Sequence, residues 1–131
     1  MSLFFKKIQR KNPQDTNENA PKRWYISLKS VGMKREREIA ILAADGTTLD
    51  PKEAELAFSR FGKVVVQLLL DGNTVEIANL GSFRLTASSD AADSKEELTA
   101  NHVKNLNLRF IPYSSTKEAL KKAKFIDLET M

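Results

Sequence analysis

The clearest hydrophobic pattern in the chain is a stripe at helical spacing between residues 51 and 71. Apolar residues recur there at alternating intervals of four and three, which places them on one face of a helix. They are Ala54, Phe58, Phe61, Val65 and Leu68. Asp50 is a suitable N-cap, Pro51 suits the first turn, and Gly72 ends the segment. The pattern predicts a long helix.

The second half of this helix is apolar on nearly every side. The run VVVQLLL follows Lys63, and a surface helix of a monomer should not be apolar all round. Burial on more than one side, for example at a dimer interface, is the simplest explanation. The β-branched VVV run would also fit a strand, but the stripe and the cap favour a helix.

Period-two alternation predicts strands after the long helix. Val75 and Ile77 flank Glu76, and Phe83-Arg84-Leu85 resumes the alternation after a break. We predict a hairpin whose tight turn contains Gly81, because glycine takes a positive φ without steric cost. Residues 106–111 alternate again, with Asn107 and Arg109 on one side, and Pro112 ends this strand.

Two more strands are expected before the first helix, from Leu3 to Arg10 and from Lys22 to Val31. A solvated loop bounded by Pro13 and Pro21 separates them. They form either an accessory hairpin or an added basic edge. Basic residues beside aromatic ones can bind nucleic acid, and they can equally protect an edge strand from aggregation. The cluster consists of Lys6, Lys7, Arg10, Lys11, Lys22 and Arg23, with Trp24 and Tyr25 close by.

The remaining segments are a first helix, an arm and a last helix. Good helix formers run from Met33 to Asp45. Residues 86–105 are polar and rich in small residues, which predicts a loop or a projecting arm. A short basic helix is expected from Ser115 to Phe125.

Composition narrows the class of protein. The net charge of +4, from 21 Lys and Arg against 17 Asp and Glu, is compatible with a polyanionic partner. The chain has no cysteine, which excludes disulfides, thiolate metal sites and thiol nucleophiles and fits an intracellular protein. We expect neither a signal peptide nor a membrane span, since no apolar run approaches about 20 residues.

Catalysis is the least favoured class of function. The single histidine, His102, lies on the expected arm and has no partners for a Ser-His or metal constellation. There is also no glycine-rich phosphate loop. We therefore expect no enzyme, no metal and no cofactor.

From residue 33 onward, the order of elements resembles the HU/IHF family of bacterial histone-like DNA-binding proteins. Leu49 leads into the second helix as in the family, Ala54, Ala57 and Phe58 match residues within that helix, and Gly81-Ser82-Phe83 resembles the family's G-F-G-[TS]-F turn. Phe110-Ile-Pro-Tyr, followed by Lys117-Glu-Ala-Leu-Lys-Lys, is similar to its A-F-K-P-G-K-x-L-K ending. The HU-like branch with an N-terminal β extension would account for residues 1–31.

The resemblance implies an α+β fold and an intertwined HU/IHF-like dimer. A two-helix base, a β saddle with an arm and a C-terminal helix would occupy residues 32–131, with the arm at about residues 86–105 and an added N-terminal β-hairpin at residues 1–31. The dimer interface and core would contain Phe58, Phe61, Val65, Leu68, Phe83 and Phe110.

The function implied is that of a sequence-tolerant architectural protein that condenses double-stranded DNA as a homodimer in the nucleoid of the bacterial cytoplasm. Phosphate contacts and deformability, rather than base sequence, would carry the affinity. The implied DNA-binding residues are Arg84, Arg109, Lys95, Lys104, Lys117, Lys121 and Lys122.

The arm departs from the family. The family's arm is basic, and a proline at its R-N-P tip inserts between base steps. Residues 86–105 contain no proline and no arginine, and four acids outnumber Lys95 and Lys104. RKNP at residues 10–13 resembles the tip but lies in the extension. An HU-fold protein-interaction module with weakened or lost DNA binding is therefore the alternative.

Overall fold

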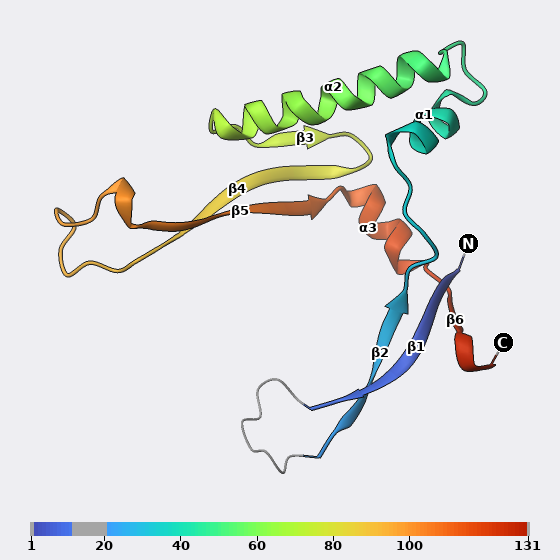
Figure 1. The fold of residues 1–131 in the computed structure, drawn as a ribbon, viewed down its shortest axis with the longest axis horizontal. Coiled ribbons are helices and arrows are strands. Elements are labelled where there is room, and N and C mark those ends of the chain that lie inside the picture. The colour runs from blue at the N-terminus through green and yellow to red at the C-terminus, as the bar shows by residue number, and fades with distance from the viewer. Residues whose placement is uncertain (1, 12–20, 131) are drawn as a thin grey trace. The chain divides into compact units, whose positions relative to one another are not determined.

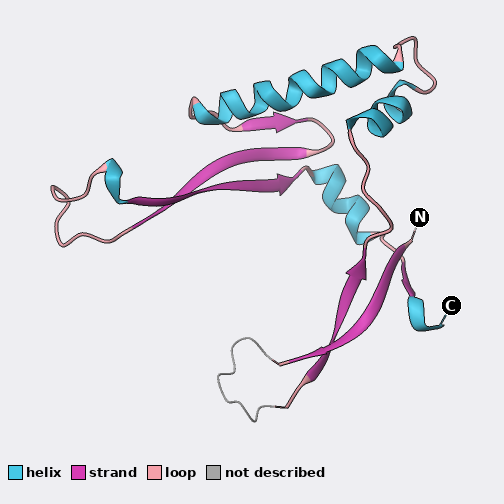
Figure 2. Cartoon of the chain, in the orientation of Figure 1, coloured by secondary structure: helices cyan, strands magenta, loops and turns pink. Residues whose placement is uncertain are grey.

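The structure is a computed structural model that describes residues 2–11 and 21–130. The chain forms two compact units, which are treated separately. The central unit consists of residues 34–119, and the terminal unit combines residues 1–33 with residues 120–131. Figure 1 follows the chain through its elements, and Figure 2 distinguishes helices from strands. The fold is α+β, with helices and two small sheets.

Two helices form the base of the central unit. Helix α1 (Glu36–Ala44) packs against α2 (Pro51–Leu70), and small side chains make this contact. Ala40, Ala44 and Ala54 are buried together there. The Asp50 carboxylate accepts a hydrogen bond from the backbone N–H of Lys52 at 3.1 Å and so caps α2. The long helix is confirmed, and the VVV run is helical.

A three-stranded antiparallel sheet in the order β3-β4-β5 follows α2. Its strands are β3 (Val75–Ile77), β4 (Gly81–Ser89) and β5 (Val103–Pro112). Phe83 and Phe110 are register partners, and their ring centroids are 4.9 Å apart. The predicted hairpin and the later strand are both present.

Gly81 has a steric role as well as a conformational one. Its φ of 157° is positive, as predicted, but the prediction that Gly81 lies in the turn is wrong, because it is the first residue of β4. The left-handed residue of the turn is Asn79, with φ 67°. A Cβ at Gly81 would meet the backbone carbonyl oxygen of Ile111 and the ring of Phe110. Glycine is therefore needed because β5 approaches β4 closely at this point.

The arm begins as a two-stranded ribbon. Strands β4 and β5 stay paired from Gly81 and Pro112 to Ser89 and Val103, with an irregularity between Ser88 and Ser89. Residues 86–89 and 103–105, expected in the loop or arm, are therefore strand. A short 3₁₀ helix, η1 (Ala100–His102), leads back into β5.

The last helix is shorter than expected. Helix α3 covers Ser114–Lys121, and the Thr116 hydroxyl donates to the Asn79 and Leu80 carbonyls at 2.9 and 3.1 Å. These bonds tie the start of α3 to the turn between β3 and β4. Phe125 was predicted at the end of this helix, which is wrong, because it lies in a strand.

The terminal unit contains a second three-stranded sheet in the order β2-β1-β6. Strand β1 (Leu3–Arg10) pairs antiparallel with β2 (Arg23–Lys29) and parallel with β6 (Phe125–Asp127). Lys7 Nζ lies 3.3 Å from Asp127 Oδ2, and a 3₁₀ turn, η2 (Leu128–Thr130), follows β6. The predicted solvated loop and the asparagine and proline of RKNP fall outside the described residues.

The described part of the chain buries little apolar surface. Among the described residues, the buried apolar ones are Ala40, Ala44, Ala54 and Leu69, and no large side chain is fully buried. Phe61 of α2 is 61% exposed and Leu108 of β5 is 59% exposed. A chain of this length normally encloses a larger core. The central unit therefore has apolar faces that a single copy does not cover.

Candidate nucleic-acid interface

The β4–β5 ribbon brings two arginines directly opposite each other. Arg84 pairs in register with Arg109, and Thr86 pairs with Asn107. Strand alternation places these four residues on one face, opposite to the face of Phe83 and Phe110. The sequence predicted this face for each residue, but only the register shows that the arginines are opposed.

This arginine pair has no acidic partner among the described residues. The ion pairs found within the described residues join Lys7 to Asp127 and Lys104 to Asp90, and neither involves an arginine. Like charges directly opposite each other on a sheet are destabilising. Both side chains are exposed, and Glu76 lies on the same face without forming an ion pair with either. An external anion would relieve the repulsion and form charge-assisted hydrogen bonds with both guanidinium groups.

The two arm lysines differ in their surroundings. Lys104 Nζ lies 2.9 Å from Asp90 Oδ1, where β4 ends and β5 begins. Lys95 is exposed in the connecting segment and is followed directly by Glu96 and Glu97. The arm thus has little free positive charge.

Of the three lysines near the end of the chain, Lys117 and Lys121 lie one turn apart on α3, and Lys122 directly follows the helix. Lys117 lies in α3 and belongs to the central unit with Arg84 and Arg109. Lys121 is the last residue of α3 and belongs to the terminal unit, as does Lys122. Lys122 was predicted inside the helix, which is wrong, because the helix ends one residue earlier.

An open apolar hollow lies between α2 and the β3–β4 hairpin. Its volume is about 460 Å³. It is lined by Phe58, Phe61, Gly62, Val65, Ile77, Leu80 and Phe83. Four members of the predicted core set are in this lining, while Leu68 and Phe110 are 39% and 44% exposed. This hollow and the exposed side of β5 are thus uncovered apolar surfaces of the central unit.

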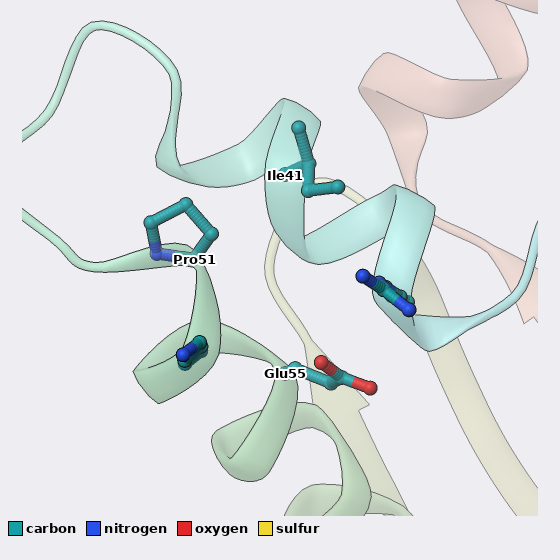
Figure 3. A pocket seen from close by; sticks show the side chains of 5 residues that line it. Ile41, Pro51 and Glu55 are labelled. Atoms are coloured by element: carbon teal, nitrogen blue, oxygen red, sulfur yellow. The ribbon is translucent and has the colours of Figure 1, made fainter.

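A second hollow lies between α1 and the start of α2 (Figure 3). It has a volume of about 400 Å³ and is lined by Arg37, Ile41, Pro51, Lys52 and Glu55. In Figure 3 the Glu55 carboxylate extends across the space between the two helices. One carboxylate with two basic groups and no nucleophile is typical of a solvated helix surface.

His102 has a local structural role. The backbone N–H of Thr99 donates to its Nδ1 at 3.0 Å, across the short η1 helix. The described residues contain no group of three or more His, Asp or Glu that could hold a metal ion. Across residues 2–11 and 21–130, no helix is long and apolar enough to cross a membrane.

A second pair of opposed arginines lies in the terminal unit. Arg10 of β1 is the register partner of Arg23 of β2, and Arg10 lies over the Tyr25 ring at 4.6 Å from its centroid. Both arginines belong to the basic cluster of the N-terminal strands, which lies outside the predicted DNA-binding set. Counting alternate positions along each strand would have placed Lys6 and Arg10 on one face.

A two-helix base, a β3-β4-β5 sheet with an arm and a short last helix define a protein of the HU class. The comparison with protein families agrees. Residues 1–127 match the HU-HIG family, described as an HU domain fused to wHTH, Ig, or Glycine-rich motif, and the chain belongs to this family. No curated protein matches the chain.

Solved structures share the fold at low sequence identity. One is a crystal structure from Bacteroides vulgatus, provisionally described as a bacterial DNA-binding protein, with a TM-score of 0.63 and 14% identity. It covers 95% of this chain, whereas this chain spans only 48% of its length. Another is HU from Anabaena in a cocrystal with DNA, with a TM-score of 0.53 and 13% identity. The match covers 68% of this chain and 99% of the Anabaena HU chain.

Proposed function

We propose that this protein is a sequence-tolerant, architectural DNA-binding protein of the nucleoid that acts as a homodimer on double-stranded DNA. The observation that carries the proposal is the opposed pair Arg84 and Arg109 on one face of the β4–β5 ribbon. Two exposed guanidinium groups without acidic partners among the described residues form a site for phosphate oxygens.

The family and the shared fold support DNA as the anion that binds to this arginine pair. The chain belongs to the HU-HIG family, and the Anabaena structure that shares its fold is an HU protein bound to DNA. Thr86 and Asn107 extend the same face of the ribbon with neutral hydrogen-bonding groups. Such groups contact phosphate and sugar and thereby fix the position of a protein on the duplex.

The homodimer is supported by the uncovered apolar surface of the central unit. Phe61 and Leu108 are more than half exposed in one protomer. Burying a Phe or Leu side chain contributes about 1.5–3 kcal/mol to the free energy of association. In a two-fold symmetric dimer the same side chain is buried in both copies, so this contribution counts twice. A second copy that covers the hollow of Phe58, Phe61 and Phe83 would supply the missing core.

The mode of binding follows from the arm. Residues 86–105 contain no proline, and Lys104 is paired with Asp90. The arm therefore has no proline wedge for the minor groove, and the proposed contact relies on phosphates along the ribbon. Such contact reads little base sequence and weakens steeply with salt.

The test is a salt titration of duplex DNA binding, followed by fluorescence anisotropy, with the Arg84→Glu/Arg109→Glu variant. The slope of log affinity against log salt should become shallower by about 0.9 for each phosphate that the variant no longer neutralises. The variant Lys52→Glu/Lys63→Glu is the matched control, because it makes the same charge change at exposed positions of α2.

Two results would contradict this proposal. Wild-type protein that forms no complex with duplex, nicked or four-way DNA at low salt would exclude DNA binding. An Arg84→Glu/Arg109→Glu variant that binds like the control would exclude the ribbon. In the first case the chain would fit an HU-fold protein-interaction module. In the second case DNA would bind to another surface of the protein.

A further inference from the structure

The positive charge of this protein is concentrated in the terminal unit. Residues 1–33 and 120–131 contain ten of the 21 Lys and Arg but only four of the 17 Asp and Glu, a net charge of +6. Residues 34–119, which include the ribbon and the arm, contain eleven basic and thirteen acidic residues, a net charge of −2. The unit with the HU-like base is thus the acidic part of the chain.

The register of β1 and β2 places basic residues on one face of the terminal sheet. Lys6 pairs with Ser27, Arg10 pairs with Arg23, and Lys29 pairs with Phe4. Paired residues share a face, and the even-numbered residues of β1 share it with one another. Lys6, Arg10, Arg23 and Lys29 therefore lie on the same face, and all four are exposed. We call them the terminal basic face.

The opposite face of the same sheet has a different composition. Trp24, Ile26 and Leu28 lie there together with Lys7, which forms an ion pair with Asp127. The lysine on this face thus has an acidic partner. None of the four residues of the terminal basic face forms an ion pair within residues 2–11 and 21–130.

Arg10 is held in place by an aromatic ring. Its guanidinium carbon lies 4.6 Å from the centroid of Tyr25, which is half-buried on the same face. A cation–π contact of this kind restrains the side chain and leaves the N–H groups free to donate. The Arg10–Arg23 pair therefore repeats, in the other unit, the opposed arginines of the β4–β5 ribbon.

We propose that the terminal basic face is a second DNA-binding surface, which contacts phosphates of a duplex through Arg10 and Arg23, with Lys6 and Lys29 beside them. This goes beyond the contact proposed for the β4–β5 ribbon. Lys6 and Arg10 lie about 13 Å apart along β1, at about 3.3 Å per residue. A duplex carries one negative charge per about 1.7 Å of axis, so phosphates are dense enough to meet every cation of this face.

The experiment uses the full-length chain and a matched pair of neighbouring substitutions. Arg10→Gln and Gln9→Glu each lower the net charge by one, at adjacent exposed positions on opposite faces of β1. Affinity for a duplex is titrated against salt for both, for Arg10→Gln/Arg23→Gln, and for Arg84→Glu/Arg109→Glu. Circular dichroism and thermal melting confirm that each variant is folded.

The proposal expects Arg10→Gln to reduce the salt slope by about 0.9 per protomer and the double glutamine variant by about twice that. Gln9→Glu should leave the slope unchanged, because its side chain lies on the other face. Loss of binding in the Arg10/Arg23 variant, with normal binding in the Arg84/Arg109 variant, would support the terminal face while contradicting the ribbon.

Equal slopes for wild type, Arg10→Gln/Arg23→Gln and Gln9→Glu would overturn the proposal and leave the ribbon contact standing. Co-sedimentation with phosphatidylserine vesicles distinguishes another polyanion. If the double glutamine variant binds DNA normally but no longer sediments with these vesicles, the face contacts membranes and the proposal is wrong.

Discussion

Lys104 Nζ lies 2.9 Å from Asp90 Oδ1 where the two strands of the arm separate. Asp90 follows the last residue of β4, and Lys104 is the second residue of β5. Both side chains are more than half exposed, at 60% and 54%, so solvent screens the pair and its effect on stability is small. The pair matters more for the proposed DNA binding, because the Asp90 carboxylate neutralises the charge of Lys104 on the ribbon.

Removing this carboxylate should strengthen DNA binding. Asp90→Asn deletes one negative charge and frees Lys104 for a phosphate. We expect tighter binding at low salt and a salt slope that is steeper by about 0.9 per protomer. Asp93→Asn is the control, because it removes the same charge from an arm residue without a lysine partner among the described residues. Equal effects of both substitutions would show that only net charge matters.

A charge placed in the apolar hollow should dissociate the proposed dimer. Phe61→Glu replaces a 61% exposed aromatic residue in the lining between α2 and the hairpin. Losing two buried phenylalanines across a two-fold axis costs roughly 3–6 kcal/mol, which raises the dissociation constant by about 10²–10⁴-fold. Light scattering over a range of concentrations measures this change.

Lys52→Glu is the control for the dimer, since Lys52 lies outside the apolar stripe of α2. The melting temperature of the wild type should also rise with protein concentration, because association stabilises the folded chain. A wild type that is monomeric at every concentration would refute the homodimer.

Gly81→Ala should destabilise the central unit. The added Cβ would meet the Ile111 carbonyl oxygen and lie 2.6 Å from the nearest ring atom of Phe110, and the backbone φ of 157° adds strain. Overpacking of this kind costs about 1–3 kcal/mol. Urea denaturation followed by circular dichroism measures this decrease in the free energy of unfolding. Ser82→Ala, at the next residue, should change the free energy of unfolding by less than about 0.5 kcal/mol.

Glu38 should make the start of α1 sensitive to acid. Hydrogen bonds from its own backbone N–H and from that of Arg35, the latter at 3.0 Å, lower the pKa of Glu38 from its ordinary value of 4.5. A lowered pKa stabilises the fold at pH values above the ordinary value, and this contribution is lost as the pH falls through the folded pKa. Denaturation at a series of acidic pH values should show a shallower decline in stability for Glu38→Gln than for Glu36→Gln.

Helix α2 was predictable because its signals are local. Asp50, Pro51 and the stripe that includes Phe58 lie within a single continuous segment. Strand β1 was predicted with its observed bounds for the same reason. The faces of Arg84 and Arg109 followed from strand alternation, but their direct opposition depends on the register between β4 and β5.

The errors come from long-range pairing. Residues 86–89 lack apolar alternation and become strand because β5 pairs with them. Strand β6 is only three residues long and pairs with Leu3–Phe5 at the other end of the chain, so no local period could reveal it. The sequence indicated a basic cluster at the N-terminal strands, but which of its residues share one face depends on the register between β1 and β2.

The parallel pairing of β6 with β1 also has a consequence for the order of folding. A ribosome releases Leu3–Phe5 before the central unit and Phe125–Asp127 after it. The central unit contains only residues between these two strands. Its helices and sheet can therefore form before β6 is available to pair with β1. During synthesis, β1 and β2 form at most an isolated two-stranded ribbon, which is marginally stable in water. The terminal basic face thus becomes a stable surface last, when the central unit is already folded.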